Sequence, residues 1–140
     1  MEYSRRDLSL LLPVLAAAAL STAQTPALPT KAYAYEDLPV KPSGVNHSRA
    51  VFKGATHSGF PIELHMTELG PNAAPHPPHK HVHEELVMIR RGTLEVTMLG
   101  KTANYGPGSI IYLASGDEHG WKNAGTEPAE YFVIALGTDS

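Results

Sequence analysis

Residues 75–92 read PHPPHKHVHEELVMIRRG and contain four of the eight histidines in the chain. Alternate side chains of a β-strand point to the same face, so a strand here would direct His79 and His81 toward one point. Glu85 follows in the same stretch and offers a carboxylate as a third metal ligand. Imidazole and carboxylate together suit iron, manganese, nickel, zinc or copper. The stretch therefore predicts a metal site, with a strand over residues 85–90.

A helix is the alternative for the same stretch. His79 and His83 are four residues apart, as on a zinc-binding helix, and Val82, Leu86 and Ile89 fit a helical stripe. Three prolines precede the segment, however, and an Arg-Gly pair ends it just before a strongly alternating stretch. These features favour a β-hairpin over a helix.

Short apolar stretches separated by turn residues recur along the chain after residue 45. Residues 60–69 alternate well: Ile62, Leu64 and Met66 share one face, and the other face is polar and carries His65. Turn residues recur at about the 8–12-residue spacing that is typical of a sandwich or barrel. The sequence therefore predicts an all-β domain. Its expected strands are residues 50–52, 60–69, 85–90, 93–99, 109–113, 118–122 and 129–136.

A second stretch with a histidine, residues 108–123, reads GSIIYLASGDEHGWKN. Together the two stretches resemble the two sequence motifs of the cupin family, in the form of a small single-domain member. The first motif, His-x-His followed by Glu and Gly, is matched by His79, His81, Glu85 and Gly92. The second motif, with its spaced Gly, Gly, His and Asn, is matched by Gly108, Gly116, His119 and Asn123.

Two departures from these motifs affect turns rather than ligands. Ala114 stands where the family has proline, and eight residues rather than five separate Gly70 from His79. The resemblance spans residues 45–136 and implies a jelly-roll β-barrel. It also implies one divalent transition metal in the barrel, with iron or manganese favoured and zinc, nickel or copper as further candidates. Its ligands would be His79, His81, Glu85 and His119. An empty barrel is disfavoured because these polar groups are costly to bury without a metal.

The first 23 residues have the layout of an export signal. Residues 4–8 read SRRDL and resemble a twin-arginine signal, with an ordinary secretory signal as the alternative. A short apolar stretch and small residues up to Ala23 follow. Residues 24–42 are rich in proline and are expected to form a linker or an N-terminal arm, and residues 43–140 the barrel domain. The predicted location is therefore periplasmic or extracellular.

Length and composition exclude several classes of protein. A chain of 140 residues suffices for one domain. Its formal net charge of -3 argues against nucleic-acid binding. No apolar stretch reaches the roughly 18 residues of a membrane span, so no membrane contact is expected once the signal is removed. The absence of cysteine excludes disulfides, thiolate metal sites and cysteine nucleophiles.

These observations predict an exported mononuclear metal-binding cupin that acts on a small organic molecule, as a metal-dependent oxygenase or decarboxylase. The alternative is a non-catalytic periplasmic module that binds a metal or a small ligand. Four protein ligands leave open positions on a metal that prefers five or six, so either role is compatible with the site. No catalytic residue is identified by the motifs. A homodimer is expected, because edge strands pair readily and small members of the family are commonly dimers.

Other side chains near the motifs have less specific roles. His65 lies on the polar face of its strand, from which it could reach the pocket as an acid–base group. His76 and His83 are expected at the pocket rim or as further ligands. Surface positions are expected for His47, His57, Lys80 and Lys122. Packing in the core or at the rim is favoured over substrate contact for Tyr105, Tyr112 and Trp121.

Overall fold

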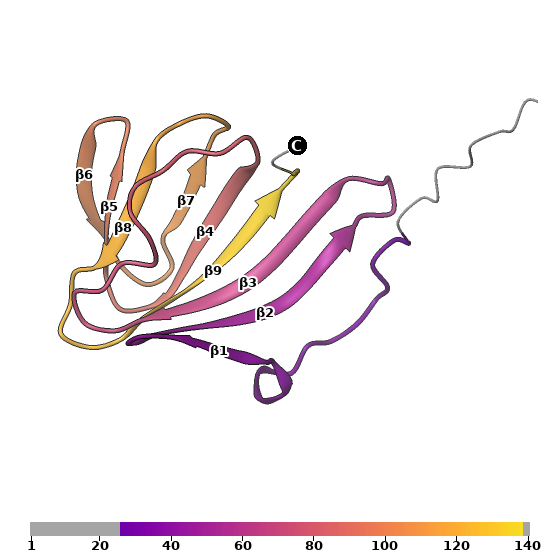
Figure 1. Ribbon diagram of the computed structural model, residues 1–140, viewed down its shortest axis with the longest axis horizontal. Coiled ribbons are helices and arrows are strands. Elements are labelled where there is room, and N and C mark those ends of the chain that lie inside the picture. The colour runs from indigo at the N-terminus through magenta and orange to yellow at the C-terminus, as the bar shows by residue number, and fades with distance from the viewer. Residues whose placement is uncertain (1–25, 139–140) are drawn as a thin grey trace, which may run out of the picture.

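The structure is a computed structural model that describes residues 26–138. These residues form one short 3₁₀-helix, η1 (Tyr35–Asp37), and nine strands: β1 (Val40–Ser43), β2 (Asn46–Ala55), β3 (Pro61–Leu69), β4 (Glu84–Arg91), β5 (Leu94–Met98), β6 (Lys101–Tyr105), β7 (Ile110–Leu113), β8 (His119–Asn123) and β9 (Ala129–Leu136). One antiparallel sheet has the order β1-β2-β3-β9-β4-β7 and the other β6-β5-β8 (Figure 1). The all-β prediction is confirmed.

The hydrophobic core draws on strands of both sheets. Val87 of β4 and Val133 of β9 come from the six-stranded sheet, and Leu94 and Val96 of β5 from the three-stranded sheet. Trp121 and Tyr131 are the largest side chains of this core, and Tyr131 is almost completely buried. The two sheets are therefore held together by the apolar faces that they turn toward each other.

Two strands of the structure, β1 and β6, were not expected from the sequence. Every residue of β1 is exposed, and so is every residue of β6 except Tyr105. Both strands lie at an edge of their sheet. A strand that buries neither face has no hydrophobic alternation to reveal it. Pairing with β2 and with β5, rather than local sequence, makes these segments strands.

The helical alternative for the histidine-rich stretch is wrong. Glu84–Arg91 forms strand β4, which pairs with β7 on one side and β9 on the other. His79 and His81 lie before β4 in an irregular segment, so the expectation that both project from a regular strand is also wrong.

Strand β3 turns its polar face toward the interior. His65 is paired with Val133 of β9, and Val133 with Val87 of β4. Directly opposite residues of an antiparallel pair point to the same side of the sheet, and both valines are in the core. His65 therefore points inward, and the alternate row that includes Leu64 and Ile134 points outward.

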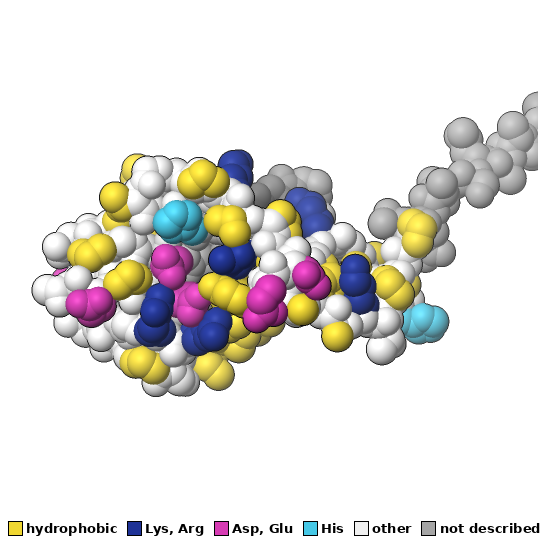
Figure 2. Space-filling view, turned by 90° about the horizontal axis from the view of Figure 1, so that it is seen from below, with side chains coloured by type: hydrophobic (Ala, Val, Ile, Leu, Met, Phe, Trp, Pro, Cys, Tyr) yellow, Lys and Arg dark blue, Asp and Glu magenta, His cyan; other side chains and the backbone are white. Residues whose placement is uncertain are grey.

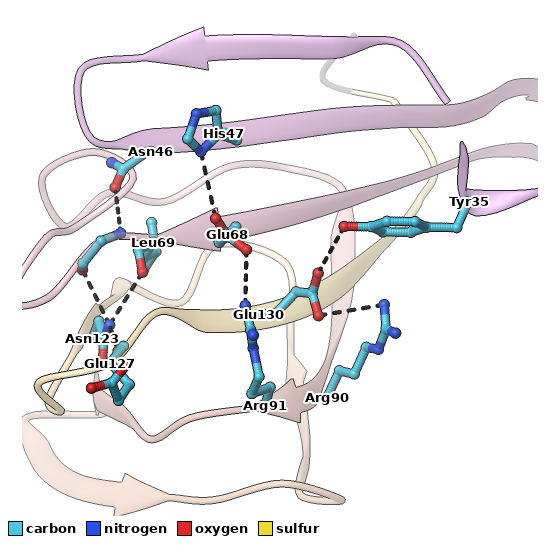
Figure 3. A network of polar contacts seen from close by, with 11 residues as sticks. Tyr35, Asn46, His47, Glu68, Leu69, Arg90, Arg91, Asn123, Glu127 and Glu130 are labelled. Carbon is cyan, nitrogen blue, oxygen red and sulfur yellow. Dashed lines mark hydrogen bonds and ion pairs between the residues drawn. The ribbon is translucent and has the colours of Figure 1, made fainter. Parts of the chain in front are cut away.

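Residues before β1 pack against the barrel as an arm. The amide of Leu28 donates to the carbonyl of Ala55 at 2.8 Å. The Tyr35 hydroxyl donates to Glu130 Oε1 at 3.5 Å, and the guanidinium of Arg90 lies 5.4 Å from the Tyr35 ring centroid (Figure 3). Arg90 Nη1 also lies 3.4 Å from Glu130 Oε2. The arm is thus tied to strands β2, β4 and β9.

Acidic and basic side chains are intermixed on the face of the molecule seen in Figure 2. On the outer side of the six-stranded sheet, Arg91 of β4 pairs with Glu68 of β3 at 2.9 Å, and His47 of β2 lies 3.5 Å from the same carboxylate (Figure 3). Exposed pairs of this kind contribute at most about 1 kcal/mol each. They link neighbouring strands without determining the fold.

One end of the barrel, here called the closed end, is formed by Gly92, Asn123 and Ala129. The Asn123 side-chain amide donates to the carbonyls of Leu69 (3.2 Å), Gly70 (3.1 Å) and Glu127 (2.7 Å), as Figure 3 shows in part. Its oxygen accepts the Gly125 amide at 2.9 Å. A Cβ on Gly92, whose φ is +78°, would lie 2.7 Å from the Cα of Ala129. The packing at this end therefore requires glycine at position 92.

The predicted export signal, residues 1–23, lies outside the described residues. The predicted boundary between arm and barrel, after residue 42, falls inside β1. No helix in residues 26–138 is long and apolar enough to cross a membrane.

Candidate metal centre

The segment before β4 runs alongside β8 and brings the two histidine stretches together. His79 and His119 exchange both backbone hydrogen bonds, at 3.0 and 2.9 Å, and the Gly116 amide donates to the His81 carbonyl at 2.9 Å. Prolines in this segment have no amide to donate, so the pairing remains an isolated bridge rather than a strand. A Cβ on Gly120 would lie 3.0 Å from Pro78, so this glycine permits the close approach.

All four predicted ligands meet at this point. Ligand atoms of His79, His81 and His119 lie within 4.8 Å of one another. Glu85 approaches from β4, with its Oε2 atom 3.4 Å from His81 Nε2 and 3.7 Å from His119 Nε2. His119 and Glu85 are buried, with 1% and 9% of their surfaces exposed. Three imidazoles thus meet at one point, and the Glu85 carboxylate lies beside two of them.

Backbone hydrogen bonds determine which nitrogen of two of these rings carries the proton. His81 Nδ1 lies 2.7 Å from the carbonyl of His83, and His119 Nδ1 lies 2.9 Å from the carbonyl of Asp117. A carbonyl can only accept, so each Nδ1 is the donor and each neutral ring presents a lone pair at Nε2. These are the hydrogen bonds that orient histidine ligands in metal sites.

The two Nε2 atoms have no hydrogen-bond partner although they are buried, and neither has His79 Nδ1. Each buried polar atom left unpaired costs about 1–3 kcal/mol. The two Nε2 lone pairs also face the carboxylate Oε2, so acceptor opposes acceptor. A cation among them would satisfy all of these atoms at once, and the donor set is one that divalent transition metals bind. The residues present therefore fit the metal that the resemblance implied.

The surroundings of His79 favour its neutral form. Burial lowers the pKa of His79, and the nearby imidazoles lower it further, while Glu85 opposes them. A neutral imidazole is the form that binds a metal. The environment of this ring therefore agrees with its place among the ligands.

Two cavities reach the centre and share part of their lining. One has a volume of about 400 Å³ and includes His76, Trp121 and Tyr131 in its wall. The other has a volume of about 750 Å³ and extends past His83 toward the ends of β3 and β9. Three residues line both: Glu63, His65 and Glu85. A small molecule in either cavity would therefore have access to Glu85.

Ionisable side chains contact one another along the wall that the two cavities share. Lys53 Nζ lies 2.9 Å from Glu63 Oε2, and His65 Nδ1 lies 3.8 Å from Glu63 Oε1. Burial lowers the pKa of His65, against the opposing charges of Glu63 and Glu85. Burial also raises the pKa of Tyr131 to about 12, so this phenol stays protonated at neutral pH. The lowered pKa favours the neutral His65 imidazole, the form that can accept a proton.

The remaining sequence-predicted residues are distributed around the centre. His76 is exposed and lies at the cavity rim, with its ring 4.1 Å from that of His79. Trp121 is buried in the core, whereas Tyr112 is 53% exposed. Tyr105 packs against the core from its edge. Exposed positions, as expected, are those of His47, His57, Lys80 and Lys122.

The sequence reasoning did not find Glu63, which belongs to the cavity wall. The available signal was the alternation of residues 60–69, in which Glu63 and His65 share a face. Without a second strand beside it, that alternation does not say which face is inward.

A family model matches the chain, and solved structures share its fold. Residues 65–135 match the Cupin_2 family, described as a cupin domain. An RmlC-like cupin from Shewanella frigidimarina NCIMB 400 has a TM-score of 0.66 at 13% identity, over 82% of this chain and 95% of that one. The polyketide cyclase RemF from Streptomyces resistomycificus has a TM-score of 0.64 at 20% identity, over 78% and 80%. A predicted oxalate decarboxylase from Thermotoga maritima has 0.63 at 16%, over 77% and 100%.

None of the curated proteins compared matches this sequence. At such low identities the solved structures show the fold alone. The family match covers half of the chain, from His65 in β3 to Ala135 in β9, and includes all four predicted ligands. The fold is therefore a jelly-roll barrel, and the chain belongs to the cupin family.

Proposed function

We propose that the chain is a mononuclear metal protein in which His79, His81, Glu85 and His119 bind one divalent transition metal. The observation that carries this proposal is the pair of buried Nε2 lone pairs directed at the Glu85 carboxylate. Iron and manganese are the favoured metals, and zinc, nickel and copper also accept this donor set.

We further propose that the centre acts on a small organic molecule, as a metal-dependent oxygenase or decarboxylase. A bound metal would supply Lewis acidity and an ordered site for the reactants. The chain itself supplies the cavities that lead to Glu85, and their size suits a small molecule. His65, whose Nδ1 lies 3.8 Å from Glu63 Oε1, would give or take a proton at the cavity wall. Structural neighbours that carry the names of a cyclase and a predicted decarboxylase are compatible with such chemistry.

Export to the periplasm belongs to the same proposal and is supported by the sequence of residues 1–23. Its test is the location of the full-length chain in cells, compared with a variant in which Arg5 and Arg6 are both replaced by Lys. Loss of export in that variant would support the twin-arginine route. Unchanged export would support an ordinary secretory signal.

A homodimer is the proposed assembly. The outward row of the six-stranded sheet is apolar across four strands, where Tyr112, Leu86, Ile134 and Leu64 are neighbours. Tyr112 is 53% exposed and Ile110, which belongs to the same outer face, is 66% exposed. Light scattering at high protein concentration tests this assembly, and a strict monomer would contradict it.

The central experiment is the metal content of the untagged full chain, followed by titration of the metal-free protein. Stoichiometric iron or manganese is expected, and His119→Gln should abolish it. His57→Gln is the matched control, because His57 is exposed and remote from the motifs. A wild-type protein that takes up none of the five metals would contradict the site.

Turnover is tested separately on the metal-loaded protein. Oxygen uptake with enolic or diketone substrates and carbon dioxide release from small carboxylic acids are measured with and without the His119→Gln substitution. Activity that disappears in the variant supports the enzyme. Tight metal binding without any turnover would instead favour the non-catalytic binding module.

A further inference from the structure

His83 stands between two predicted ligands in the sequence and has no place in the family motif. In the structure its ring lies parallel to that of His81, with 3.7 Å between the centroids and 5° between the planes. Only 15% of the His83 side chain is exposed. The residue is therefore packed into the centre and is not a group at the solvent-facing rim.

The two oxygens of Glu85 have different neighbours. Oε1 lies 3.1 Å from His83 Nε2, which is a hydrogen-bond distance, and a carboxylate oxygen can only accept. Oε2 instead faces the lone pairs of His81 and His119 at 3.4 and 3.7 Å. His83 thus donates a hydrogen bond to Glu85 without any metal, whereas His81 and His119 make no hydrogen bond to it.

We propose that His83 is a positioning residue that holds Oε1 of Glu85 and so leaves only Oε2 for the metal. The inference rests on the proposed metal site and specifies how its carboxylate binds. One carboxylate oxygen and three imidazoles occupy four positions, which leaves two positions of a six-coordinate metal for a small molecule. If Glu85 used both oxygens, one of those positions would be lost.

A rival arrangement uses the same residues. Ligand atoms of His81, His83 and Glu85 also lie close enough together to hold an ion, with His83 as a ligand. Buried nitrogens without a partner occur in His79, His81 and His119, however, and those of His83 are not among them. The unsatisfied atoms therefore indicate that the metal binds at His79, His81 and His119, and that His83 lies beside this group.

The test compares three variants of the full chain, each titrated with manganese(II). His83→Phe keeps a flat ring for stacking but removes the donor, and His83→Gln keeps an amide donor. His57→Phe is the matched control, because His57 is exposed and remote from the motifs. We expect affinity to fall about 10–100-fold in His83→Phe, as for other residues that hold a ligand. It should recover to within a few-fold of wild type in His83→Gln and stay near wild type in His57→Phe.

Two spectroscopic readouts separate positioning from ligation. Pulsed electron paramagnetic resonance on the copper(II)-loaded protein should report the same number of bound imidazoles in wild type and His83→Phe. Loss of one imidazole in the variant would make His83 a ligand and overturn the proposal. Infrared difference spectra of manganese-loaded wild type, which need no variant, should show the wide carboxylate splitting of one-oxygen binding. A narrow splitting would overturn it as well.

The outcomes also distinguish this inference from the metal site on which it depends. Wild type that binds neither manganese(II) nor copper(II) would defeat the proposed function itself. Wild type that binds normally, with unchanged affinity in His83→Phe, would defeat the role of His83 alone.

Discussion

Strand β8 carries a buried polar residue at each end, and the two have opposite hydrogen-bond status. Asn123 is 0% exposed and His119 is 1% exposed. At the closed end, the Asn123 amide and oxygen are fully used by four backbone groups. At the other end, here called the open end (His79, His81, Glu85 and His119), His119 Nε2 has no partner. Burial alone therefore does not separate these two residues, whereas the hydrogen bonds of their side chains do.

Both residues fit the same family motif, so sequence similarity alone treats them equally. The comparison predicts that they fail in different ways when replaced. Substitutions at the closed end should reduce stability and leave metal binding intact. Substitutions at the open end should weaken metal binding and leave the stability of the metal-free protein nearly unchanged.

The largest effect is expected for Asn123→Leu. The substitution removes the side-chain partner of three carbonyls and one amide at the closed end, so the free energy of unfolding should fall by about 3–5 kcal/mol. Urea unfolding of the metal-free protein measures this loss. Asn104→Leu on the exposed edge strand β6 is the matched control and should change little. A loss below about 1 kcal/mol at position 123 would remove the contrast between the two ends.

His119→Leu should show the opposite behaviour. Removing a ligand should weaken metal affinity by more than the roughly 10–100-fold that loss of an outer partner costs. The metal-free protein should keep its stability to within about 1 kcal/mol, because removal of the unpaired Nε2 lone pair beside a carboxylate offsets the lost hydrogen bond from Nδ1 to the Asp117 carbonyl. Metal titration and urea unfolding of the same preparation measure the two quantities. Strong destabilisation with unchanged affinity would reverse the assignment of the two ends.

Gly92→Ala tests the packing of the closed end. A side chain at positive φ costs about 1–2 kcal/mol, and contact with the Ala129 backbone adds about 1–3 kcal/mol. Gly100→Ala is the control for strain alone, because its φ is +70° and nothing lies within 4 Å of the new Cβ. Thermal unfolding should show the larger loss at position 92. Equal losses would mean that the close approach to Ala129 contributes nothing.

The smallest effect concerns the pH dependence of stability of the metal-free protein. The folded state lowers the pKa of His65 below 6.5, so the unfolded chain binds the proton more readily. Stability contributed by neutral His65 is therefore complete above pH 6.5 and declines as the pH falls below it. The pKa of His79 is lowered too, so His79 adds to the same decline in stability. The test therefore compares the decline of a variant without His65 with that of wild type. His65→Gln should show a shallower decline between pH 7 and pH 5 than wild type, and an identical decline would contradict the inward position of His65.

The candidate ligands could be predicted from the sequence because their spacing is a property of the chain itself. His79, His81 and Glu85 lie within seven residues, and His119 falls at the motif spacing after Gly116. Strand β9 (Ala129–Leu136), rich in β-branched and aromatic residues, was predicted with its observed bounds, and the alternating strands β3 and β5 were predicted to within one residue at each end. The exposed strands β1 and β6 were not, because they bury no face that would leave a pattern.

By itself, the sequence determined the family, the all-β class and the identity of the residues that meet at the centre, since these depend on local composition and spacing. Only the tertiary structure decided that the polar face of β3 is inward, that Asn123 is satisfied while His119 is not, and that His83 holds one oxygen of Glu85. Each of these facts depends on the register between strands that are distant in sequence. Register is set by the packing of the whole barrel, so no single stretch of the chain records it.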